Sequence, residues 1–140
     1  MKQRTLVLIK PDAVRRGLIG SIITRFENEQ LFLRAVNLKI VNRHLAESHY
    51  VQHKGKHFYD RLIASLIGYE VIALMYEGED IIQKIRKLVG DTNPEKALSN
   101  TIRGMFGRVT SDGIIENVVH ASANPEEAKY EIKLWFGEDK

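Results

Sequence analysis

A histidine and a carboxylate in the last quarter of the chain form its most informative pair of reactive groups. Glu131 lies three residues after Ala128 and four residues before Trp135, inside the apolar stripe of an expected helix. Burying an unpaired carboxylate is unfavourable, so an inward-facing Glu131 needs a partner. The nearest candidate is His120, in the strand that leads into this helix. A slight rotation of the helix would instead leave Glu131 in water, and the sequence leaves both possibilities open.

Pairing with a carboxylate would give His120 a defined chemistry. A carboxylate bonded to one ring nitrogen fixes the tautomer and leaves the lone pair of the other nitrogen free. A histidine nucleophile or general base requires that lone pair. Alone, a histidine in a strand is more often a satisfied core or edge residue, so the hypothesis of a catalytic His120 depends on Glu131.

The remaining histidines crowd one segment, where they are His44, His49, His53 and His57. Three of them recur every four residues, which raises the question of a metal site. The zinc-protease motif would place Glu directly after the first histidine, whereas Tyr50 follows His49. Gly55 should also break the helix before His57. We therefore predict a solvated helix face here and no metal site made by the protein.

A phosphate site would have to be built from side chains, because the chain has neither a GxxxxGK[ST] loop nor a GxGxxG motif after a strand. Lys10 ends the first expected strand, Arg86 lies late in a helix, Thr92 follows that helix and Arg103 stands before Gly104. Guanidinium groups bind phosphate oxygens bidentately and offset charge in phosphoryl transfer. Taken singly, each of these residues is more often an ordinary solvated side chain.

Composition limits the classes of protein. A chain of 140 residues with a net charge of +3 and no cysteine fits one domain, residues 1–140, without disulfides or Cys-ligated metal. The longest apolar run, Val71–Tyr76, is far too short to span a membrane, and the N-terminus lacks the features of a signal peptide. We expect a soluble cytoplasmic protein. With no RNP-type aromatic motif and no dense basic run, we expect no nucleic-acid partner.

Hydrophobic spacing predicts the elements that must position these residues. Strands are expected at Thr5–Ile9, around Val36–Ile40, at Val71–Tyr76 and at Ile115–Ala121. Helices are expected at 20–30, 44–54, 58–66, 81–89 and 125–136, while Asp91–Glu116 has no periodicity and is expected to be a long functional loop before the last strand. The order β-α-β-α-α-β-α-β-α predicts an α+β fold, a ferredoxin-like sandwich with a four-stranded antiparallel sheet covered by helices.

Eight ordered segments together form a recognisable pattern, and they are Thr5–Val14, His49-Tyr50, Phe58, Glu77-Gly78, Gly90–Pro94, Thr101–Gly104, Asn117–Ser122 and Glu131–Phe136. Through these segments the chain resembles the nucleoside diphosphate kinase family over nearly its whole length.

This resemblance implies a ping-pong reaction. His120 would attack the γ-phosphate of a nucleoside triphosphate, become phosphohistidine, and pass the group to a nucleoside diphosphate, with Glu131 orienting its ring. The residues implied to contact phosphate or ribose are Lys10, Tyr50, Arg86, Thr92, Arg103 and Asn117. Phe58 would stack on the base, which implies broad base specificity. Mg²⁺ would be held mainly between the phosphates, and the protein would be a homo-oligomer, a tetramer or a hexamer.

Three departures from the family pattern bear on activity. Ala123 and Met105 replace acidic residues that usually follow the His-Gly-Ser and Thr-Ile-Arg-Gly motifs. The segment Gly107–Glu116 is longer than usual and places His120 17 positions after Arg103. An alternative is therefore a catalytically weakened family member that acts as a nucleotide- or protein-binding module.

Overall fold

A four-stranded antiparallel sheet forms the centre of the molecule. In the computed structural model, which describes residues 2–137, its strand order is β2-β3-β1-β6. The strands are β1 (Lys2–Ile9), β2 (Phe32–Ile40), β3 (Glu70–Glu79) and β6 (Val119–Ala121). The inner strand β1 pairs with β3 on one side and with β6 on the other, both antiparallel. The apolar run at the start of the chain therefore becomes a strand that is buried on both faces.

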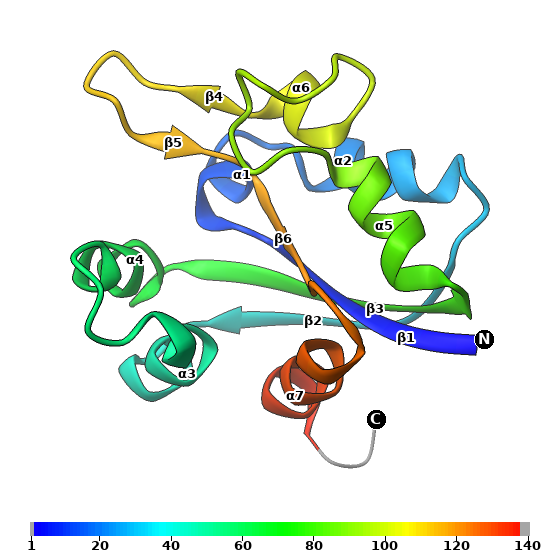
Figure 1. Ribbon diagram of the computed structural model, residues 1–140, viewed down its shortest axis with the longest axis horizontal. Helices are drawn as coiled ribbons and strands as arrows, with labels where there is room; N and C mark the ends of the chain where they lie inside the picture. Colours follow the sequence, from blue (N-terminus) through cyan, green and yellow to red (C-terminus); the bar gives the residue numbers. More distant parts are fainter. Residues whose placement is uncertain (1, 138–140) are drawn as a thin grey trace.

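Helices cover both faces of this sheet (Figure 1). One face carries α2 (Ile19–Glu27) and α5 (Ile81–Val89), and the other carries α3 (Arg43–His49), α4 (Tyr59–Leu66) and α7 (Pro125–Phe136). Successive side chains of β1 point to opposite faces, so Val7 packs with the first group of helices and Leu8 with the second. The prediction of a ferredoxin-like α+β sandwich is confirmed.

The prediction that Asp91–Glu116 lacks regular structure is wrong. This segment contains α6 (Ile102–Phe106) and a two-stranded hairpin of β4 (Arg108–Val109) and β5 (Ile115–Glu116). Thr101 caps α6 by accepting from the Gly104 N–H, and the Arg108–Glu116 ion pair at 2.6 Å joins the two short strands. Elements of two to five residues are too short to produce a readable hydrophobic period.

Other boundaries also differ from the expectation. A short helix, α1 (Pro11–Arg15), follows β1 directly, because Pro11 occupies the first helical position, where proline is favoured. The expected helix at 44–54 ends at His49 and continues as a 3₁₀ turn, η1 (Val51–His53). The expected strand Ile115–Ala121 is divided between β5 and β6, which belong to different sheets.

No helix within residues 2–137 is long and apolar enough to cross a membrane. The assignment of residues 1–140 to a single domain stays a prediction.

Candidate active site

His120 and Glu131 meet between β6 and α7. His120 lies opposite Leu8 of β1 in the sheet, so its side chain faces α3 and α7, and 26% of that side chain is exposed. Its Nε2 lies 3.0 Å from Oε2 of Glu131, whose side chain is only 3% exposed. The predicted inward-facing, paired Glu131 is confirmed, and the alternative of a solvated Glu131 is wrong.

Ser122 engages the second oxygen of this carboxylate. Its Oγ donates to Oε1 of Glu131 at 2.6 Å, and its backbone N–H donates to the Leu6 carbonyl at 3.1 Å. A carboxylate only accepts hydrogen bonds, so Nε2 of His120 carries the proton, and in the neutral ring Nδ1 keeps a free lone pair. No role for Ser122 was predicted from the sequence. Its place two residues after His120, on the same face of the strand, was the signal that could have identified it.

His49 is buried, contrary to the prediction of a solvated helix face. It is 4% exposed, and its Nδ1 accepts a hydrogen bond from Trp135 Nε1 at 3.1 Å. Its ring also lies edge-on to that of His120, with centroids 4.6 Å apart. His49 follows the buried Leu45 at helical spacing, which was the overlooked signal. Burial, reinforced by His120, holds the pKa of His49 well below its usual value.

The atoms of His49, His120 and Glu131 that could ligate a metal lie within 4.8 Å of one another. Their hydrogen bonds nevertheless oppose metal binding. Nδ1 of His49 accepts from Trp135, and Nε2 of His120 donates to Glu131. His49 has no free lone pair and both Glu131 oxygens are bonded, so Nδ1 of His120 is the one atom of this group ready to ligate, and one ligand does not make a metal site.

Lys10, Asn117 and Thr92 lie together beside the histidine. Lys10 Nζ donates to Asn117 Oδ1 at 3.0 Å, and Asn117 Nδ2 donates to the Thr92 carbonyl at 3.4 Å. Burial lowers the pKa of Lys10, although the carboxylate of Asp12 partly opposes this effect. A poorly hydrated ammonium of this kind gains strongly when an anion approaches.

Arg103 connects three backbone segments near His120. Its guanidinium donates to the carbonyls of Gly90 at 3.0 Å, Asn117 at 3.4 Å and Val119 at 2.7 Å. An arginine has five N–H donors, so two remain for a ligand. Burial, together with the neighbouring charge of Arg86, lowers the pKa of Arg103 to about 10, and the side chain stays charged at neutral pH.

The backbone just before His120 adopts an unusual conformation. Val118 has φ = 61°, in the left-handed region that a β-branched residue rarely occupies. Its N–H donates to Asp12 Oδ2 at 3.1 Å, and its carbonyl accepts from the Lys10 N–H at 2.9 Å. These bonds and complete burial of Val118 offset the strain. Asp12, to which the sequence analysis gave no role, therefore helps to hold the strand that carries His120.

The two aromatic candidates lie on the side of α3 and η1. Tyr50 packs edge-on against His49, with ring centroids 4.8 Å apart, and burial raises its pKa to about 12. Phe58 is partly exposed, and its ring lies 5.3 Å from that of His53, which in turn lies 6.1 Å from Tyr50. The rings of His53, Tyr50 and His49 thus form a series of neighbours that leads from Phe58 to His120.

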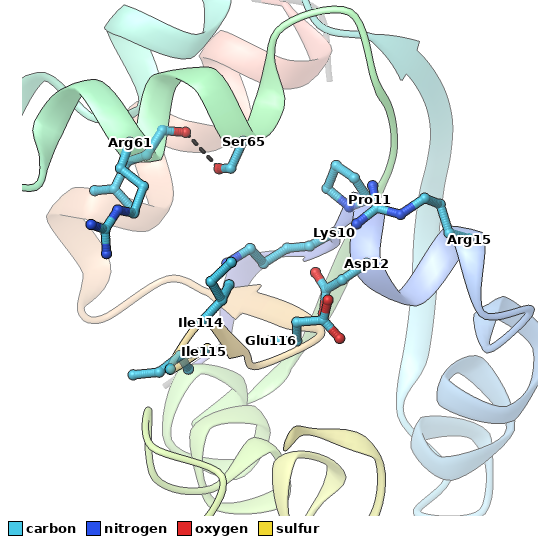
Figure 2. Close-up of a pocket in the computed structure, with 11 residues that line it drawn as sticks. Lys10, Pro11, Asp12, Arg15, Arg61, Ser65, Ile114, Ile115 and Glu116 are labelled. Carbon is cyan, nitrogen blue, oxygen red and sulfur yellow. Dashed lines mark hydrogen bonds between the residues drawn. The ribbon is translucent and has the colours of Figure 1, made fainter. Parts of the chain in front are cut away.

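A cavity of about 290 Å³ opens next to Lys10. Figure 2 shows Arg61 of α4 and Ile114 of the β4–β5 hairpin on opposite sides of it, with Lys10 between them. Leu62 and Ile115 add apolar surface, and the cavity is large enough for part of a small ligand.

Fold and site together define an α+β protein with a carboxylate-held histidine beside a group of cations. The chain matches the family model "Nucleoside diphosphate kinase" over residues 3–140. It is 47% identical to a nucleoside diphosphate kinase of Methanocaldococcus jannaschii over 140 residues, covering all of this chain and 97% of the relative. It is 48% identical over 134 residues to one from Clostridium perfringens, covering 96% and 91%.

Solved structures agree with these sequence matches. A transition state mimic of nucleoside-diphosphate kinase from Borrelia burgdorferi, with bound vanadate and ADP, superposes with a TM-score of 0.91 at 38% identity, covering 99% of this chain and 89% of that one. A halophilic nucleoside diphosphate kinase from Halobacterium salinarum, in complex with CDP, gives 0.90 at 35% identity, covering 99% and 90%. The chain belongs to the nucleoside diphosphate kinase family.

Proposed function

We propose that this chain is a phosphotransferase that moves the γ-phosphoryl group of a nucleoside triphosphate to a nucleoside diphosphate through phosphorylated His120. The observation that carries the proposal is the contact of His120 Nε2 with Glu131, whose other oxygen is bound by Ser122. This arrangement leaves Nδ1 as the nucleophile. The vanadate- and ADP-bound relative from Borrelia burgdorferi supports phosphoryl transfer as the chemistry.

In the first half-reaction, the Nδ1 lone pair of His120 forms a bond to the γ-phosphorus. The bond between that phosphorus and the β–γ bridging oxygen breaks, and the nucleoside diphosphate leaves with the electron pair. In the second, a terminal oxygen of the acceptor diphosphate attacks the same phosphorus, and the P–N electrons return to Nδ1. The phosphorylated ring is an imidazolium, and the adjacent Glu131 carboxylate stabilises its positive charge.

Three cations, of which Arg103 feels the charge of Arg86, are proposed to bind the phosphates. Lys10, Arg86 and Arg103 would offset the negative charge that spreads over the transferring group. Thr92, Asn117 and Tyr50 would donate hydrogen bonds to phosphate or ribose oxygens. Arg103 is proposed to do this with its two remaining donors while it holds the backbone around His120 in place.

Base binding is assigned to Phe58. A stacking ring accepts every base, since each has a π face, so broad base specificity is part of the proposal. Ile114 and Ile115 would supply the opposite wall, because the hairpin carries them to the cavity beside Lys10.

Mg²⁺ is the cofactor we propose, bound mainly through the nucleotide phosphates. The nearby carboxylates fit this arrangement, because Asp12 accepts the Val118 N–H and Glu131 is held by His120 and Ser122. Neither offers a vacant set of oxygens for a protein cage. When bound, Mg²⁺ neutralises phosphate charge and orients the triphosphate.

Intact-mass spectrometry after brief incubation with ATP and Mg²⁺ tests the proposal. We expect one acid-labile phosphoryl group on the protein, which disappears when GDP or CDP is added. His120→Ala should take up none, whereas His44→Ala, at an exposed histidine, should behave like the unmodified chain. Nucleotide binding without any phosphoryl uptake would overturn the proposal and favour a binding module.

Self-association is the second part of the proposal. Within residues 2–137, β2 is an edge strand that pairs with β3 alone. Its exposed apolar side chains are Phe32, Val36, Leu38 and Ile40, each at least 56% exposed. A second copy of this chain can pair with this edge antiparallel, since two identical strands meet correctly about a two-fold axis.

We also place the protein in the cytoplasm, where nucleoside triphosphates are available as donors.

A further inference from the structure

We propose that His49 is a positioning residue for His120. In this arrangement, Trp135 fixes the ring of His49 in one tautomer and orientation, and His49 in turn fixes the plane of the His120 ring. The inference rests on the proposed phosphorylation of His120 and assigns a role to a buried group that this reaction does not otherwise use.

The tautomer of His49 follows from its partner. An indole N–H can only donate, so Nδ1 of His49 is the acceptor in the 3.1 Å contact with Trp135, and the proton of the neutral ring lies on Nε2. Trp135 is fully buried in the core beneath the sheet. The hydrogen bond therefore comes from a fixed point and sets the orientation of the His49 ring as well as its tautomer.

His120 needs a second constraint that Glu131 does not provide. Glu131 holds Nε2, and the backbone of β6 holds the β-carbon. The ring can still rotate about the line between these two points, and Nδ1 lies off that line. Rotation would turn the Nδ1 lone pair away from an incoming phosphorus. Small misalignments of the reacting atoms slow transfer reactions strongly.

The contact with His49 limits this rotation. The two rings lie nearly perpendicular, at 81°, with centroids 4.6 Å apart. Since His49 is itself held by Trp135, the edge-to-face contact presents a rigid surface to His120. Glu131 and His49 together then define both the position and the plane of the nucleophile.

The charge state of His49 suits this role. Burial is the main cause that lowers its pKa, and His120, Lys10 and His53 lower it further, so the ring is neutral at physiological pH. A neutral neighbour adds no second positive charge when His120 becomes a phosphorylated imidazolium.

Three variants separate positioning from simple packing. His49→Leu removes the ring and the acceptor, His49→Asn keeps an acceptor near the position of Nδ1, and Trp135→Phe keeps an aromatic ring but removes the N–H donor. Rapid-quench measurement with Mg²⁺ and ATP should show phosphorylation about tenfold slower in His49→Leu and within about threefold of the unmodified rate in His49→Asn. ATP affinity should not change in any of them.

Nitrogen-15 NMR of His120 supplies the readout that packing alone would not move. We expect a single Nε2–H form in the unmodified chain and mixed or broadened ring signals in His49→Leu and Trp135→Phe. His44→Leu, at an exposed position of the same helix, is the matched control and should be unchanged in rate and signals.

The two proposals fail in different ways. An unmodified chain that takes up no phosphoryl group would overturn the proposed function. The NMR signals would still report whether His49 fixes the ring of His120. Unmodified rates and ring signals in both His49→Leu and Trp135→Phe would overturn the positioning role. If His49→Leu does not fold, Trp135→Phe decides alone, and an unchanged rate with unchanged signals counts against the inference.

Discussion

Two residues in contact with His120 have polar atoms that other side chains already hold. Glu131 uses both carboxylate oxygens, and His49 receives the only indole N–H of the chain. A site organised before its substrate arrives loses little free energy to reorganisation during the reaction. Because these hydrogen bonds require particular protonation states, the stability of the fold should depend on the protonation of His49.

His49 should make stability depend on pH. Its folded-state pKa lies well below 6.5, whereas the unfolded chain takes up a proton near that value. The unfolded state therefore binds more protons as the pH falls, and folding stability falls with it, by up to ~1.4 kcal/mol per pH unit for one proton. The contribution is fully present above about pH 6.5 and is lost below it.

Urea denaturation at several pH values between about 7.5 and 5.5 measures this dependence. We expect the loss of stability toward acid to be smaller in His49→Asn, which cannot take up that proton, than in the unmodified chain. His44→Asn, at an exposed histidine, serves as the control. Equal pH slopes in the unmodified chain and His49→Asn would contradict the expectation.

Pairwise spacing predicted the residue contacts better than single residue types did. Glu131 inside an apolar stripe, beside a strand with a histidine, suggested the pair that the structure contains, although a solvated Glu131 was left open. His49 was misplaced because four histidines in one segment suggested solvent, although its spacing from Leu45 pointed inward. The roles of Asp12 and Trp135 depend on contacts across 106 and 86 positions of the chain, which no local pattern encodes.

At the scale of elements, α7 matters because it carries both Glu131 and Trp135 to the site. Asn124 caps this helix by accepting from the Glu127 N–H at 2.9 Å. Glu127 in turn accepts the Ala123 N–H at 3.3 Å. A carboxylate one turn into the helix thus bonds the backbone of Ala123, where the family usually has an acidic side chain.

Removing the cap should destabilise the protein and loosen the site together. We expect Asn124→Ala to lower the free energy of unfolding by ~1 kcal/mol, because the Glu127 N–H loses its acceptor. Asn124→Asp, which retains an acceptor, should stay near the unmodified value. Thermal denaturation followed by circular dichroism measures both, and equal melting temperatures for Asn124→Ala and the unmodified chain would show that the cap contributes nothing.

Elements were predictable where they are long and apolar on one face. Strands β1 and β3 were recognisable from continuous apolar runs, β2 from its alternation, and α2, α5 and α7 from their helical period. The hairpin β4–β5 and helix α6 have two to five residues each, and their stability comes from contacts such as Arg108–Glu116 and the Thr101 cap. The predicted strand that contains His120 also began too early in the sequence. It was not interrupted at Val118, because the φ observed there is one that a β-branched side chain disfavours.

At the scale of the whole molecule, the free edge of β2 predicts assembly. We expect light scattering to give a mass well above the 16.0 kDa of one chain. Leu38→Lys should reduce that mass, because it places a charge in the apolar row on β2. Leu98→Lys, at an apolar residue that is 72% exposed and outside β2, should leave it unchanged. A monomeric unmodified chain, or an unaltered mass in Leu38→Lys, would contradict assembly through this edge.

The pairing of β6 with β1 also has a consequence for biosynthesis. His120 pairs with Leu8, and Ser122 bonds to Leu6 across 116 positions of the chain. Both β1 and β6 must therefore be synthesised before His120 can take up its position in the sheet. Glu131 and Trp135 come later still in the chain. A nascent polypeptide that has emerged only as far as β6 carries the histidine without the carboxylate that orients it. If His120 is phosphorylated as proposed, a chain can accept the phosphoryl group only after Glu131 and Trp135 have also been synthesised and have folded against β6.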